Sequence, residues 1–126
     1  LDSLFLIDQV YQNPADMYKE QGQRADITCS HSIDNYDRIL WYKQIKGHLQ
    51  YLGYIVGNLG RPETGANVTI IGNANKDQTC TLTIKDLTLN SSAVYFCAAR
   101  FHSLLIATYH YTGFLLTVLP VSHCRI

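Results

Sequence analysis

Hydrophobic and polar residues alternate along most of this 126-residue chain, in short stretches that polar turns separate. Between Arg24 and Ser30, for example, Ala25, Ile27 and Cys29 share one parity. A period of two is typical of a strand that buries one face. The same pattern predicts strands over residues 4–13, 24–30, 39–45, 49–56, 68–71, 79–84, 95–97 and 114–119. The sequence therefore predicts an all-β fold.

Stretches rich in glycine, asparagine and charged residues punctuate these strands. Residues 31–38 are predicted to form a first loop and residues 57–62 a second. A third loop, over residues 100–110, differs because it is mostly apolar. Pro14 closes the first strand, as suits an edge strand whose ladder a proline interrupts.

Cys29, Trp41, Tyr95 and Cys97 stand in an order and at a spacing typical of an immunoglobulin sandwich. In that fold the tryptophan packs on a disulfide between the sheets, and the tyrosine ties its corner to upstream backbone. We therefore expect a Cys29–Cys97 disulfide, with Trp41 and Tyr95 in the core. The long separation of the two cysteines leaves room for the extra strand pair of a variable-type domain. The predicted fold is a variable-type immunoglobulin β-sandwich of two antiparallel sheets with Greek-key topology. It would span residues 1–120, with 121–126 as a tail or the start of a linker.

The other two cysteines leave alternatives open. Cys80 shares the inward parity of Leu82, which we expect in the core. There a free cysteine behaves as a small hydrophobe, but Cys80 can also be read as bridged to Cys124. Cys124 could instead pair with another chain.

Composition narrows the classes of function. Ten basic and ten acidic residues give no net charge, so the composition shows no excess of positive charge that would favour binding to nucleic acid or to an anionic membrane. Four cysteines in a short all-β chain favour an oxidising compartment. No apolar run approaches the roughly 20 residues that span a bilayer. We expect an extracellular ectodomain of a single-pass receptor, or a fragment of one, whose anchor lies outside these residues.

Catalysis is not expected. The five histidines show neither the helical i, i+4 spacing of a zinc site nor zinc-finger distances to cysteine. His123 and Cys124 are adjacent and cannot close a metal site alone. We therefore predict no enzyme activity, no metal and no cofactor.

Two glycosylation sequons are present, at Asn67-Val68-Thr69 and Asn90-Ser91-Ser92. Asn90 falls in a crossover that should be exposed, which makes it the better candidate.

Two surfaces are candidates for binding. In the third loop, Leu104, Leu105 and Ile106 cannot all be buried beneath one loop, and an exposed apolar patch usually marks a partner surface; alternatively the loop folds back over the sheet. On the strands, Tyr42, Gln44 and Phe96 face away from the core by parity. With Leu49 they are predicted to form a dimer interface, unless the long loop covers that face.

With these residues placed, the chain resembles a known family. Trp41-Tyr42-Lys43-Gln44 and the run 92–98 look like the framework of T-cell receptor and antibody variable domains, and the match runs from about Gln12 to Leu119. Gln12 matches the framework glutamine of the first strand. Gln44 matches the glutamine that bonds across the dimer in paired variable domains.

The sequence departs from this pattern at two places. The joining motif Phe-Gly-x-Gly is replaced by residues 110–113, where only Gly113 remains. Ser91 stands where the family has an acidic residue that pairs with an arginine. A degenerate joining segment with a hydrophobic third loop is similar to the novel immune-type receptors of bony fishes, which are germline-encoded innate receptors.

The resemblance implies a cell-surface innate immune receptor that binds a protein on another cell through its loop end. One alternative is a T-cell receptor β-like variable domain that recognises presented peptide. A homodimerising adhesion module, using the predicted dimer interface, is the other. The expected ligand contacts are Tyr36, Asp37, Leu59, Arg61, Phe101, His102, Leu104, Leu105, Ile106 and Tyr109.

Overall fold

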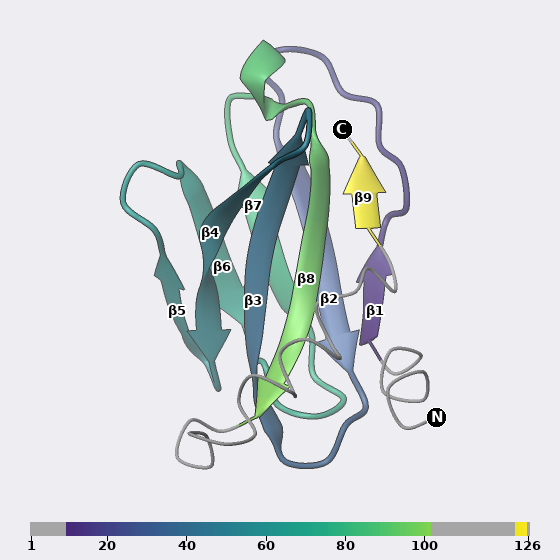
Figure 1. Ribbon diagram of the computed structural model, residues 1–126, viewed down its shortest axis with the longest axis vertical. Helices are drawn as coiled ribbons and strands as arrows, with labels where there is room; N and C mark the ends of the chain where they lie inside the picture. Colours follow the sequence, from purple (N-terminus) through teal and green to yellow (C-terminus); the bar gives the residue numbers. More distant parts are fainter. Residues whose placement is uncertain (1–9, 102–122, 126) are drawn as a thin grey trace.

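The computed structural model describes residues 10–101 and 123–125 (Figure 1). Over these residues it contains two antiparallel sheets, so the predicted all-β sandwich is confirmed. The strands are β1 (Val10–Asn13), β2 (Ala25–His31), β3 (Tyr36–Ile45), β4 (His48–Val56), β5 (Leu59–Pro62), β6 (Val68–Gly72), β7 (Cys80–Ile84), β8 (Val94–Phe101) and β9 (His123–Arg125). One short 3-10 helix, η1 (Leu89–Ser91), precedes β8.

The four-stranded sheet has the order β1-β2-β7-β6, and the five-stranded sheet has the order β5-β4-β3-β8-β9. The chain therefore crosses from one sheet to the other after β2, after β5 and after β7. As a result the β2–β3, β4–β5 and β6–β7 connections lie at one end of the sandwich, where β8 also ends (bottom of Figure 1). We call this end the loop end.

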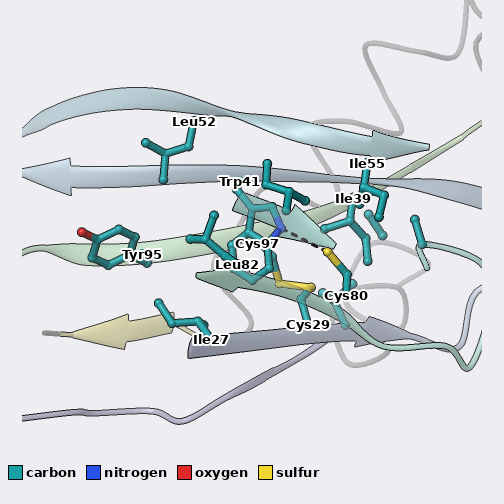
Figure 2. Packing of buried hydrophobic residues seen from close by; sticks show 14 of the residues in the cluster. Ile27, Cys29, Ile39, Trp41, Leu52, Ile55, Cys80, Leu82, Tyr95 and Cys97 are labelled. Carbon is teal, nitrogen blue, oxygen red and sulfur yellow. Dashed lines mark hydrogen bonds between the residues drawn. A yellow bond between two sulfur atoms is a disulfide. The ribbon is translucent and has the colours of Figure 1, made fainter. Parts of the chain in front are cut away.

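The core lies between the sheets, where the inward residues of each strand meet (Figure 2). Cys29 and Cys97 form the predicted disulfide, and Trp41 and Leu82 are fully buried beside it. The indole Nε1 of Trp41 donates a hydrogen bond of 3.3 Å to Sγ of Cys80. Cys80 is a free, buried thiol rather than a partner of Cys124, and burial raises its pKa to about 11.

Two buried polar side chains hold β8 in place, and one of them joins the two sheets. The phenol of Tyr95 donates to the carbonyl of Ser91 at 2.7 Å, which is the corner contact that the sequence predicted. Gln12 bridges the sheets: its Nε2 donates to the carbonyl of Tyr95 at 2.9 Å, and its Oε1 accepts from the amide of Cys97 at 3.2 Å. Ser91 also caps η1, since its Oγ accepts from the amide of Thr88.

The predicted first and second loops were too long. His31 still belongs to β2 and Tyr36 already belongs to β3, so the first loop is reduced to residues 32–35. Residues 59–62, predicted as loop, form β5 and pair with β4 through Val56 and Leu59. In both cases, contacts with distant strands outweigh a local sequence that favours turns.

Some predicted elements lie outside the described residues, namely the start of the first strand at 4–9 and the strand at 114–119. Within the range expected to be a tail, β9 pairs with β8, and His123 lies opposite Phe96. In the described part of the chain no helix is long and apolar enough to cross a membrane.

Candidate pairing face and recognition loops

The outer face of the five-stranded sheet consists of cross-strand tiers from β4, β3 and β8. The strand register places Leu49, Gln44 and Val94 in one tier, Tyr51, Tyr42 and Phe96 in the next, then Tyr54, Leu40 and Ala98, and finally Val56, Arg38 and Arg100 at the loop end. None of these twelve residues belongs to the core cluster. We call this surface the pairing face.

Aromatic side chains form the second tier. The rings of Tyr42 and Tyr51 have centroids 5.3 Å apart and an interplanar angle of 49°, a tilted arrangement favourable for aromatic pairs. Burial raises the pKa of Tyr42, and burial with the neighbouring Tyr42 raises that of Tyr51 to about 12. Both phenols are therefore neutral at physiological pH, which suits a surface that becomes drier when a partner covers it.

The predicted interface residues do share this face. Gln44 lies opposite Leu49 in the first tier, and Tyr42 lies opposite Phe96 in the second. Leu49 is 57% exposed, whereas Tyr42, Gln44 and Phe96 are partly exposed.

Sequence reasoning missed the other eight residues of this face, which are Arg38, Leu40, Tyr51, Tyr54, Val56, Val94, Ala98 and Arg100. Leu40 and Arg38 share the parity of Tyr42 along β3, so the alternation that identified Tyr42 could have included them. Tyr51 shares the parity of Leu49 along β4 and could have been found in the same way. Tyr54 and Val56 could not, because the register shift between Trp41 and Tyr42 changes the parity of β4. Leu40 and Ala98 are buried although they lie on the side away from the core.

The predicted ligand contacts of the first loop are not both on the surface. Tyr36 is 4% exposed and belongs to the core, so its prediction as a loop contact is wrong. Tyr36 has the parity of the outward Arg38, but the register shift between these two residues turns its side chain toward the core. Asp37 lies at the register shift that follows, and it is partly exposed.

The second loop offers exposed side chains. Leu59 is 58% exposed and Arg61 is exposed, both on the edge strand β5. For the third loop, the backbone of Phe101 ends β8, whereas His102, Leu104, Leu105, Ile106 and Tyr109 lie outside the described residues.

Hydrogen bonds tie the loop end together. The carbonyl of Asp37 accepts from the amide of Gly57 at 3.0 Å, and the carbonyl of Gly57 accepts from the amide of Ala74 at 2.8 Å. These bonds join the first loop, the second loop and the β6–β7 turn into one support.

His31 completes this support from inside. Its ring is 1% exposed, Nδ1 accepts from the amide of Ile33 at 3.1 Å, and Nε2 lies 2.7 Å from the carbonyl of Ala74. These partners assign the proton to Nε2, so the ring is neutral. Burial lowers the pKa of His31, which favours the same neutral form.

No group of three or more histidine, cysteine or acidic residues is placed to hold a metal ion within residues 10–101 and 123–125. The described residues form an aromatic sheet face and a set of braced loops, and both features are suited to binding another protein.

A family model for the immunoglobulin V-set domain matches residues 12–119. The chain belongs to the immunoglobulin V-set family. V-set domains typically serve recognition rather than catalysis.

Curated relatives agree with this assignment. The human T cell receptor alpha variable 26-1 is 32% identical over 96 residues, which cover 75% of this chain and 85% of the relative. A mouse T-cell receptor gamma chain V region, V108B, is 33% identical over 101 residues, covering 75% and 86%. Human T cell receptor beta variable 16 is 28% identical over 98 residues, covering 73% and 81%. The chain is thus a receptor-type V-set domain related to T-cell receptor variable regions, a relationship that suggests a cell-surface ectodomain.

A solved structure supports the fold alone. A chain from a study of T cell specificity and activation by the bacterial superantigen toxic shock syndrome toxin-1 superposes with a TM-score of 0.64 at 24% identity. The superposition covers 75% of this V-set domain and 82% of that chain.

Proposed function

We propose that this V-set domain is the recognition domain of a cell-surface immune receptor. It pairs with a second variable-type domain through the pairing face and recognises a protein on another cell at the loop end. The observation that carries this proposal is the aromatic tier of Tyr42, Tyr51 and Phe96, which lies outside the core on the face away from the other sheet. Aromatic residues are enriched at the centres of protein interfaces.

The loop end supports the recognition half of the proposal. Hydrogen bonds from Gly57 to Asp37 and from Ala74 to Gly57 hold the loop bases in fixed positions, so ligand contacts would be presented with little loss of loop entropy. Leu59, Arg61 and Asp37 are the described residues proposed to contact the ligand. Phe101, His102, Leu104, Leu105, Ile106 and Tyr109 are proposed as contacts from the third loop.

Staining of a panel of cells with the labelled domain tests recognition. Leu59→Asp should abolish staining of the responsive cells because it places a charge among the proposed contacts. Leu89→Asp is the matched control, since Leu89 is 79% exposed on η1 at the opposite end (Figure 1). Equal staining by both variants, with unchanged thermal unfolding, would show that recognition does not use the loop end.

The receptor is proposed in two forms that differ at the third loop. The loss of the joining motif at residues 110–113 favours a germline-encoded innate receptor, as in the novel immune-type receptors of bony fishes. The T-cell receptor relatives favour a variable domain that is completed by rearrangement and recognises presented peptide. Transcripts from single cells distinguish the forms: one sequence over residues 100–110 in every cell supports the innate form, and a different sequence in each cell supports the rearranged form.

The two sequons are proposed to carry glycan at the end opposite the loop end. Asn67 and Asn90 are exposed and line the same surface groove of about 660 Å³, whose lining also includes Gly65, Lys85 and Thr88. Glycans in this groove would leave both the pairing face and the loop end open.

Thr69→Ala and Ser92→Ala test the two sites in secreted protein from animal cells. They are preferable to substitution of asparagine because Asn67 has a φ of 56°, a left-handed conformation that asparagine tolerates. Each variant should lose the mass of one glycan, measured before and after enzymatic removal of N-glycans. An unchanged mass would exclude the corresponding site.

A further inference from the structure

A surface groove of about 660 Å³ lies between the two sheets, at the end opposite the loop end. Lys43 of β3 forms part of its lining, two residues along the strand from the core residue Trp41. In the register of β3 and β8, Lys43 lies opposite the buried Tyr95. Directly opposite residues share a face of the sheet, so Lys43 faces the interior. A lysine therefore occupies a position that the alternation assigns to the core, and the sandwich is open there.

The facing wall of the groove comes from the four-stranded sheet. Val68 of β6 and Ile84 of β7 are cross-strand partners in this wall; Ile84 belongs to the core, and Val68 packs against it. A cleft of this size that joins apolar surface to a few polar groups suits a small ligand. A sugar fits this description, because its hydroxyl groups lie around the edge of the ring and its C–H groups form apolar faces.

The ammonium group of Lys43 is placed to bind an oxygen ligand. Its Nζ donates a hydrogen bond of 3.1 Å to the carbonyl of Asn90. An ammonium group has three N–H donors, so further donors remain for an acceptor in the groove. Burial lowers the pKa of Lys43, which shows that the charged group has lost part of its hydration. Hydroxyl or amide oxygens of a ligand would replace that water.

The sequon Asn67-Val68-Thr69 is part of the groove. Residues 65–69 all line it, so Asn67 stands in the middle of one wall. A glycan attached to Asn67 would begin directly over the apolar surface that Val68 and Ile84 form. The other sequon asparagine, Asn90, also lines the groove, but it lies on η1, where the neighbouring Leu89 is 79% exposed to solvent. The two sequons therefore differ in how much of the domain surrounds the attached sugar.

We propose that the groove binds the first sugars of an N-linked glycan on Asn67, with Lys43 as the polar contact, whereas a glycan on Asn90 stays in solvent. This inference rests on the proposed glycosylation of the two sequons and adds a site within the domain that holds one of the glycans. Covalent attachment keeps the effective concentration of the sugar high, so weak contacts are sufficient. The seated sugar contacts both sheets where the core does not reach, and it stabilises the folded domain as a bound ligand does.

Enzymatic removal of N-glycans from the folded domain, secreted by animal cells, tests this proposal. Cleavage at Asn67 requires the sugar to leave the groove, so its rate follows the population of the open form. We expect the glycan on Asn67 to be released at least about ten-fold more slowly than that on Asn90. After unfolding of the protein the two rates should be equal. Mass spectrometry of the two glycopeptides measures each site separately.

Variants of Lys43 distinguish binding of the sugar from simple crowding around Asn67. Lys43→Met keeps the length of the side chain but removes its donors, so it should speed release from Asn67 several-fold and leave release from Asn90 unchanged. Lys43→Arg keeps donors at this position and should retain slow release. Lys19→Met is the matched control, because Lys19 is exposed and lies outside the groove lining, and it should behave as the wild type.

The outcomes separate the inference from the glycosylation on which it rests. Absence of glycan mass at Asn67 overturns both. Equal release rates from the folded domain, or slower release at Asn90, overturn the inference and leave glycosylation of the sequons standing. Slow release at Asn67 that Lys43→Met does not change overturns the contact with Lys43, because crowding alone would then account for the rate.

Discussion

The two sheets of this V-set domain have outer faces of opposite character. On the four-stranded sheet, the outward residues of β2 and β7 are polar. Arg24, which precedes β2, binds the carboxylate of Asp26 with a shortest distance of 2.9 Å, and Thr83 donates to the same carboxylate at 2.7 Å. On the five-stranded sheet, β3 and β8 present aromatic rings and two arginines at the same level. The centre of the first outer face is bonded by its own polar side chains, whereas the centre of the second is largely aromatic and apolar. At the edges of the four-stranded sheet, Tyr11 and Ile71 are exposed as well.

Inward and outward residues alternate along each strand, so the residues that stabilise the fold are different from those available for recognition. The inward residues of both sheets build one core around Trp41 and the disulfide. The outward residues are then free to differ, because the register of each strand holds them in place whatever their chemistry. On the four-stranded sheet the outward polar residues bond to each other, and on the five-stranded sheet they are largely aromatic and apolar.

The largest expected effect comes from removing the Gln12 side chain, which bridges the two sheets. Gln12→Ala removes the bridge between the sheets and leaves the amide of Cys97 and the carbonyl of Tyr95 without their buried partner. We expect a loss of about 2–4 kcal/mol in the free energy of unfolding, measured in urea. Gln50→Ala, at an exposed position of β4, should be close to neutral. Equal losses for the two variants would contradict the bridging role of Gln12.

A second prediction concerns pH at the loop end, where both sheets meet. The folded state keeps His31 neutral with a lowered pKa, whereas the unfolded chain takes up a proton near pH 6.5. The stabilising contribution is therefore fully present above about pH 6.5 and is lost as the pH falls below that value. The hydrogen bond to the backbone of Ala74 opposes this lowering of the pKa, as do Asp77 and Asp37, while Lys76 adds to it.

Thermal unfolding at pH 7.5 and pH 5 measures this effect. His31→Gln should lower the melting temperature at pH 7.5 and flatten the difference between the two pH values. His48→Gln, at an exposed position at the start of β4, should retain the wild-type difference. A wild-type pH dependence in the His31 variant would assign the effect to other groups.

The smallest expected effect concerns the hydrogen bond between Thr83 and Asp26 on the outer face of the four-stranded sheet. Thr83→Val keeps the shape of the side chain but removes the hydroxyl that donates to Asp26, so we expect a loss of about 1 kcal/mol. Thr81→Val, one tier away on the same strand, should cost less. If the two valine variants were equally stable, the hydrogen bond to Asp26 would not contribute to the stability of that face.

Much of this architecture could be predicted from the sequence. The alternation around Cys29, Trp41 and Cys97 fixed the core, because a period of two leaves only one set of residues that can face inward. Tyr42, Gln44 and Phe96 were found by the same parity, since residues opposite to core positions must face outward.

The remainder depended on contacts between distant strands. Tyr36 reads as a polar loop residue in its local sequence, but pairing with β8 draws it into the core. The tier of Arg38 and Arg100 exists only because β3 and β8 align at that register, and the shift between Tyr36 and Arg38 cannot be read from either strand alone. Neighbours on two different strands cannot be predicted from the sequence of either strand alone.

The most direct test of the difference between the faces is nuclear magnetic resonance of the labelled wild-type domain, titrated with the unlabelled domain as a second variable-type domain. The account predicts the largest chemical-shift changes in Leu40, Tyr42, Tyr51 and Phe96, with little change at Thr28 and Thr81 on the other sheet. Changes centred on the four-stranded sheet would contradict it.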